Sequence, residues 1–146
     1  MKRDQIRGIS NNILLTLATL YFHKNPIKGR TRFQKTIYLL QKEYDVSFDF
    51  DFRPYYYGPY SDELSDIFSL LRAMNFVEER TEYFGMGITR YSYRLTEKGR
   101  KYFKMYESQA DRETVAAIGK IQKEIPKVSK LPTPNLIAKS KQLMRG

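Results

Sequence analysis

Tyr55-Tyr56-Tyr57-Gly58-Pro59-Tyr60-Ser61-Asp62-Glu63-Leu64 is the stretch from which the fold of this chain can be worked outward. Its Gly-Pro pair predicts a turn. Ser61 stands where a helix N-cap is expected, and the two acids after it favour the positive end of the helix dipole. Apolar residues then recur with the helical period as far as Met74. The stretch therefore predicts a tyrosine-rich turn that leads into an amphipathic helix over about residues 62–75.

The residues before this stretch predict two helices and a strand. The first helix covers residues 4–23 and ends before Pro26, because proline cannot continue a helix. The second begins at Thr31, which forms a T-x-x-Q capping box with Gln34. After it, residues 46–52 alternate strictly between apolar and polar side chains, which predicts a half-buried strand.

A β-hairpin is predicted after the capped helix. Residues 77–84 and 88–95 flank a Gly-Met-Gly turn, and the register that this turn favours places opposite charges across from one another. Such cross-strand pairs stabilise a hairpin by roughly 0.2–1 kcal/mol, which supports the register. The predicted pairs are Glu78 with Arg94 and Glu82 with Arg90.

The C-terminal third predicts three more helices. Thr96 caps a helix that begins at Glu97, and residues 112–125 carry isoleucines at helical spacing. That isoleucine stripe can pack back onto the first helix or pair with a second copy of the chain, and we favour a homodimer through residues 112–125. Prolines then predict a lysine-rich linker, after which Asn135 caps a short last helix. The linker prolines are Pro126, Pro132 and Pro134.

The order of these elements predicts an α+β, mainly helical fold. It is that of a winged helix-turn-helix with a β-containing insertion between helices two and three and a helical C-terminal extension. A usual helix-turn-helix has a turn of about 3–4 residues at this point, whereas here the sixteen residues 45–60 intervene. We expect a winged-helix domain over residues 1–109 and an extension over residues 110–146 for dimerisation or packing.

Three runs resemble one known family. Gly29–Lys35 (GRTRFQK), Tyr57–Leu64 (YGPYSDEL) and Tyr93–Gly99 (YRLTEKG) are similar to motifs of the YwgA-like winged-helix group, a distant relative of the Panacea (SocA-like) antitoxin domains. The resemblance covers roughly residues 8–107. It implies a winged-helix fold without catalysis, in a group whose members are variously regulators or interaction modules.

The charge of the chain changes sign twice along its length. The formal net charge is +10, but residues 1–42 carry +8, residues 43–82 carry −7 and residues 83–146 carry +9. A strongly basic protein is expected to meet a polyanion. The acidic middle segment restricts that contact to the two basic segments.

Enzyme chemistry and membrane insertion are not expected. The chain has one histidine and no cysteine, which removes most metal sites and nucleophiles, so we predict neither cofactor nor metal and no catalytic residues. The acids of residues 49–66 could form a Mg²⁺ site of a nuclease, but a solvated strand face and a favourable helix N-terminus account for them more simply. No apolar run approaches the roughly 18 residues of a membrane span, and the start does not resemble a signal peptide. We expect a cytoplasmic protein of prokaryotic type.

The leading functional hypothesis is a dimeric transcriptional regulator that binds double-stranded DNA. The helix after Ser61 begins with acids that repel phosphate, so contacts are expected from the hairpin and the basic flanks, with the turn at residues 85–87 near a minor groove. Tyr57, Gly58, Pro59 and Ser61 are expected to be structural. The cations expected to contact DNA are Arg30, Arg32, Lys35, Arg90, Arg94, Lys98, Arg100 and Lys101.

An alternative hypothesis is a protein-interaction module of the antitoxin or adaptor type. It would use the acidic insertion and the helix at residues 62–75 to meet a basic partner. The two hypotheses assign recognition to opposite charges, and therefore to different surfaces of one fold.

Overall fold

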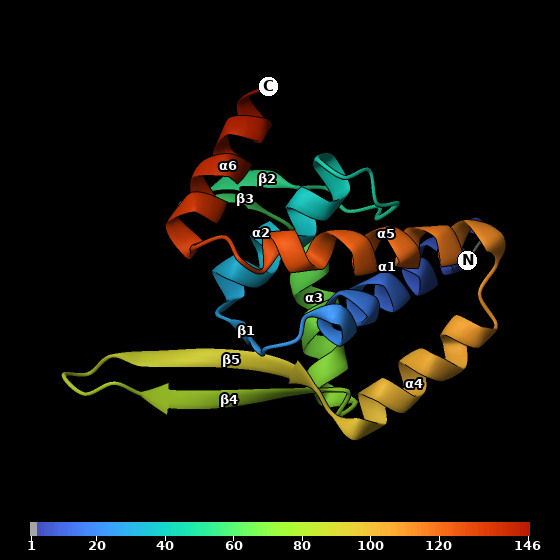
Figure 1. Ribbon diagram of the computed structural model, residues 1–146, viewed down its shortest axis with the longest axis horizontal. Coiled ribbons are helices and arrows are strands. Elements are labelled where there is room, and N and C mark those ends of the chain that lie inside the picture. Colours follow the sequence, from blue (N-terminus) through green and yellow to red (C-terminus); the bar gives the residue numbers. More distant parts are fainter. Residues whose placement is uncertain (1–2) are drawn as a thin grey trace.

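The computed structural model describes residues 3–146, with side chains described from Asn11 onward. Six helices and five short strands make up this part of the chain, so the predicted α+β, mainly helical class is confirmed (Figure 1). The helices are α1 (Arg3–Phe22), α2 (Arg30–Lys42), α3 (Asp62–Ala73), α4 (Glu97–Ser108), α5 (Arg112–Val128) and α6 (Thr133–Arg145). The strands are β1 (Ile27–Lys28), β2 (Arg53–Tyr55), β3 (Gly58–Tyr60), β4 (Val77–Tyr83) and β5 (Thr89–Leu95).

The strands form two separate antiparallel sheets. One has the order β1-β5-β4, and the other consists of β2 and β3. The long strands β4 and β5 extend away from the helices as a two-stranded arm (Figure 1). Their register pairs Glu78 with Arg94 and Glu82 with Arg90, as the charge pattern predicts. The arm is anchored at its base, where Tyr93 is fully buried against Phe68 of α3.

The caps of α3 and α4 follow the prediction. The Ser61 hydroxyl accepts a hydrogen bond from the Leu64 amide at 3.1 Å, and the Thr96 hydroxyl accepts one from the Gly99 amide at 3.0 Å. These side chains satisfy amides that the first helical turn leaves without partners.

The predicted capping box of α2 is wrong. Gly29 occupies the N-cap position, and no side chain caps this helix. Gln34 is buried and turns instead toward the backbone of Ser61, where it makes two hydrogen bonds. The Gln34 side-chain amide therefore satisfies the buried backbone of Ser61, which would otherwise lack partners, and does not cap α2.

Residues 46–52 have the predicted alternation of burial but not the predicted strand. Val46, Phe48 and Phe50 point into the core, while the polar residues between them are exposed. No strand is assigned to this segment. Side chains take the place of a neighbouring strand: Asn12 accepts from the Asp49 amide at 2.9 Å, and Gln41 bonds both the amide and the carbonyl of Phe50.

The end of α5 also differs from the prediction. The helix continues through Pro126 to Val128, so the lysine-rich linker is reduced to residues 129–132. Helix α6 begins at Thr133, with Pro132 rather than Asn135 at its N-cap position. Pro126 removes only the donor to the carbonyl four residues before it. Arg32 bonds the Val128 and Ser129 carbonyls, which the end of the helix leaves free.

The isoleucine stripe of α5 lies inside the chain. Helix α5 runs beside α1 (Figure 1), and Ile118, Ile121 and Ile125 are buried in the same core as Leu17 and Phe33. The alternative in which this helix packs back onto the first one is therefore the observed arrangement. These isoleucines are not available to a second copy, so the expected dimer contact through residues 112–125 cannot use them.

Candidate nucleic-acid interface

The tip of the β4–β5 arm is built on an unusual backbone turn. Gly85, Met86 and Gly87 all have positive φ angles, of 78°, 50° and 75°. Two glycines accept this conformation without steric cost, whereas Met86 does so at some cost in energy. The turn is closed by hydrogen bonds of 2.9 Å between Phe84 and Ile88 and between Ile88 and Gly85. It holds the Met86 side chain fully in solvent, at 100% exposure.

The arm tip, which we define as residues 83–91, carries large apolar side chains that are exposed to solvent. Tyr83 is 82% exposed, and four more large apolar residues are exposed around it. The register places Tyr83 and Tyr91 on one face of the hairpin and Phe84 with Arg90 on the other. Exposed apolar side chains gathered on a projecting element are typical of interaction surfaces. The other exposed members are Phe84, Met86, Ile88 and Tyr91. The sequence predicts the turn at residues 85–87 near a minor groove, and the position of the other apolar residues next to a double-glycine turn signals their exposure.

Arg90 adds a positive charge to this tip. Its guanidinium lies 4.7 Å from the centre of the Phe84 ring, and within the described residues no carboxylate lies within ion-pairing distance of it. Stacking on an aromatic face holds a guanidinium in place without neutralising it. Arg90 is therefore a positioned cation available for a phosphate or a base edge.

Arg94 and Lys98 lie at the base of the arm. Arg94 is paired with Glu78 at 3.0 Å, as its register position requires. The ammonium of Lys98 donates to the Met74 carbonyl at 3.1 Å and lies over the Phe76 ring. Both side chains are exposed, but each already holds the arm or the start of α4 in place.

The other predicted cations of α4 are exposed. Arg100 lies over the Tyr21 ring at 5.4 Å, and Lys101 is 3.5 Å from Glu97 on the same helix. An exposed ion pair such as that of Lys101 with Glu97 contributes little to stability, so Lys101 can exchange Glu97 for a phosphate at small cost.

Arg30 lies on the opposite face of the sheet from Arg90 and Arg94. Its Nε donates to the Tyr93 hydroxyl at 3.1 Å. Adjacent residues of a strand point to opposite faces, so the Tyr93 side chain and its partner lie across the sheet from Arg94. The hydrogen bond to Tyr93 is the main cause that raises the pKa of Arg30. The predicted cations are thus divided between two faces.

Arg32 and Lys35 are buried in the fold. Arg32 is 8% exposed and Lys35 is 2% exposed. Arg32 bonds carbonyls at the end of α5, and Lys35 donates to the Pro59 carbonyl at 2.8 Å. Their prediction as DNA contacts is corrected. Both cations bond carbonyls of distant segments inside the protein, which their position at a helix N-terminus does not reveal.

Part of the tyrosine-rich turn has the predicted structural role. Gly58 has a φ of 105°, and Gly58, Pro59 and Ser61 are buried beneath the C-terminal helix α6 and beside α2. A side chain at Gly58 would meet Lys35 and Lys141 as well as a strained backbone. Tyr57 is exposed, so its side chain contributes nothing to this packing.

An acidic surface lies apart from the arm. Glu63 in the first turn of α3 shares it with carboxylates of the 46–52 segment and of the next helical turn. Desolvation and these neighbouring carboxylates raise the pKa of Glu63. This acidic surface is defined by Asp49, Asp51, Glu63 and Asp66. All four residues belong to the segment 43–82, which the charge pattern predicts to be acidic.

Comparison of the sequence with models of known protein families found no match, and a search of the curated proteins found none either. Within residues 3–146, none of the helices combines the length and the apolar character needed to cross a membrane.

Proposed function

We propose that this protein is a winged-helix DNA-binding regulator that contacts duplex DNA chiefly through the β4–β5 arm. The observation that supports the proposal is the arm tip, where the positioned guanidinium of Arg90 lies beside exposed apolar side chains on a projecting hairpin. The order of α1, β1, α2, α3 and the β4–β5 arm agrees with a winged helix that contains an insertion.

The chemistry of the tip suits a minor groove. Proteins that bind there combine arginines with apolar side chains that wedge between base steps. Arg90 would supply the first of these groups and Met86 or Phe84 the second. Arg94, Lys98, Arg100 and Lys101 would add phosphate contacts near the base of the arm, and these contacts make binding dependent on salt.

The test is a salt titration of duplex DNA binding measured by fluorescence anisotropy. Arg90→Gln should weaken binding by about tenfold, because a groove arginine is worth roughly 1–3 kcal/mol. Arg112→Gln removes the same charge from an exposed position at the start of α5 and should leave the affinity unchanged. Absence of binding at low salt, or equal affinities of the two variants, would contradict the proposal.

The acidic surface favours a second candidate, a protein-interaction module with a basic partner. Desolvation, and then the charges of three neighbouring carboxylates, raise the pKa of Glu63, and a cationic partner would offset this repulsion. This candidate does not need the arm tip.

Two variants distinguish the DNA-binding function from the protein-interaction function. Glu63→Lys combined with Asp66→Lys should abolish capture of a basic protein identified by mass spectrometry, and should leave DNA binding intact or strengthen it. Arg90→Gln should have the opposite pattern. A partner captured equally by the charge-reversed variant would exclude the second candidate.

A further inference from the structure

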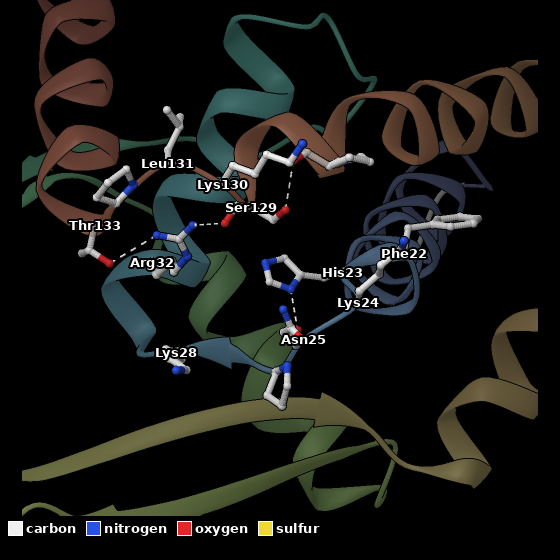
Figure 2. Close-up of a pocket in the computed structure, with 13 residues that line it drawn as sticks. Phe22, His23, Lys24, Asn25, Lys28, Arg32, Ser129, Lys130, Leu131 and Thr133 are labelled. Carbon is white, nitrogen blue, oxygen red and sulfur yellow. Dashed lines mark hydrogen bonds between the residues drawn. The ribbon is translucent and has the colours of Figure 1, made fainter.

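A basic pocket lies on the opposite side of β1 from the arm, between the end of α1 and the connection of α5 to α6. It has a volume of about 640 Å³ and is lined by residues from the α1–β1 loop, the first turn of α2 and residues 126–133 (Figure 2). Among the described residues, its lining carries four basic side chains and no acidic one. These are Lys24, Lys28, Arg32 and Lys130.

Arg32 is the centre of this pocket's charge. Its guanidinium donates to the carbonyls of Val128 and Ser129 and to the Thr133 hydroxyl, at 3.3, 2.9 and 3.3 Å. All three acceptors are neutral, and within the described residues no carboxylate forms an ion pair with Arg32. Burial also lowers the pKa of this guanidinium. A buried cation without a counter-ion is expensive, so an anion at this position would be stabilised.

His23 supplies a second unsatisfied group beside it. The side chain is 8% exposed, and its Nδ1 donates to the Asn25 carbonyl (Figure 2). In the neutral ring Nε2 then carries a lone pair. Nε2 is buried and has no hydrogen-bond partner among the described residues. Figure 2 shows this nitrogen on the side of the ring that faces Arg32. A ligand hydroxyl that reached Nε2 would provide the missing donor.

We propose that this pocket binds the phosphate group of a small phosphorylated and hydroxylated ligand, of the size of a nucleoside monophosphate. Arg32 would contact the phosphate, Lys28 and Lys130 would add positive charge from opposite sides of the pocket, and a ligand hydroxyl would donate to His23. The volume is within the range of small-molecule sites, roughly 300–1,000 Å³. The inference does not depend on DNA binding, because the pocket uses none of the exposed cations of the arm.

The experiment is an NMR titration of the full chain, followed through the imidazole signals of its only histidine, His23. The probes are adenosine 5′-monophosphate, inorganic phosphate and adenosine, at constant ionic strength. We expect saturable shifts with the two phosphate-bearing probes and none with adenosine. An equal response to adenosine, or no saturation by either phosphate probe up to about 10 mM, would overturn the proposal.

Two double variants test which cations hold the ligand. Lys28→Gln with Lys130→Gln should weaken adenosine monophosphate binding by about fivefold or more, because charge-assisted contacts are lost. Lys42→Gln with Lys123→Gln removes the same charge from exposed positions outside the pocket lining and should not change the affinity. Equal affinities of the two double variants would overturn the assignment. Arg32 is kept in both, since its carbonyl contacts also hold the end of α5.

Discussion

The side chain of Gln34 exchanges two hydrogen bonds with the backbone of Ser61. Its Oε1 accepts from the Ser61 amide at 2.9 Å, and its Nε2 donates to the Ser61 carbonyl at 3.0 Å. Both residues are buried. The contact fixes the residue that caps α3 directly to α2, although the 46–52 segment and the tyrosine-rich turn separate the two helices in sequence.

Gln34→Leu should therefore destabilise the protein by about 2–4 kcal/mol, because it leaves the amide and the carbonyl of Ser61 buried without partners. Urea unfolding measures the change. Gln122→Leu is the control, since Gln122 is exposed on α5 and should shift the free energy of unfolding by less than about 0.5 kcal/mol. Similar losses in the two variants would show that the contact is not important.

Two glycines predict opposite effects of the same substitution. A Cβ at Gly99 would lie 2.2 Å from the Phe76 carbonyl oxygen, whereas one at Gly119 would meet nothing within 4 Å. Gly99→Ala should cost about 2–3 kcal/mol or more by forcing α4 away from the end of α3. Gly119→Ala should stabilise α5 by up to about 1 kcal/mol, through helix propensity alone. Thermal unfolding of both variants measures this, and equal melting temperatures would contradict the close approach of α4.

His23 predicts a loss of stability in mild acid. Burial, with a smaller contribution from the Arg32 charge, lowers the pKa of His23 below 6.5. The unfolded chain then takes up a proton that the folded chain resists. Stability should therefore fall as the pH drops below 6.5 towards the folded-state pKa, by at most about 1.4 kcal/mol per pH unit.

The measurement is the free energy of unfolding at pH 7, 6 and 5 for the natural sequence and for His23→Gln. The variant has no histidine, so its curve should be flatter in this range. Two parallel curves would mean that the imidazole is not held neutral.

Lys35 predicts the corresponding effect in alkali. Burial, and to a smaller extent the charge of Lys141, lowers the pKa of Lys35 to about 8. Between this value and that of the unfolded chain, near 10.4, the unfolded state binds more protons. Stability should rise from about pH 8 upward, again by at most about 1.4 kcal/mol per pH unit. Lys35→Met should remove the rise, and Lys42→Met on the exposed side of α2 should retain it.

Contacts between residues near one another in sequence could be predicted, whereas contacts between distant segments could not. The caps at Ser61 and Thr96 and the register of the arm were predictable, because the groups involved lie within a few residues of one another or face each other across one turn. The capping box at Thr31 failed, because Gln34 had a second set of partners far along the chain.

The candidate site shows the same limit. Arg90 could be placed on the arm from its position relative to the glycine turn. The burial of Arg32 and Lys35 could not be predicted, since it depends on where residues 128–133 and Pro59 come to lie. The basic pocket was missed for this reason as well: its four cations come from segments about 100 residues apart.

The sequence by itself determined the helices, the hairpin register and the separation of acidic from basic segments. These features depend on periodicity, turn geometry and charge, which act over short distances along the chain. Tertiary structure alone decided which cations face solvent and which are buried. It also decided whether the isoleucines of α5 meet α1 or a second copy, and it left His23 and Arg32 together in a pocket without a counter-ion. Burial is a property of distant segments that pack together, and a residue's neighbours in sequence do not specify it.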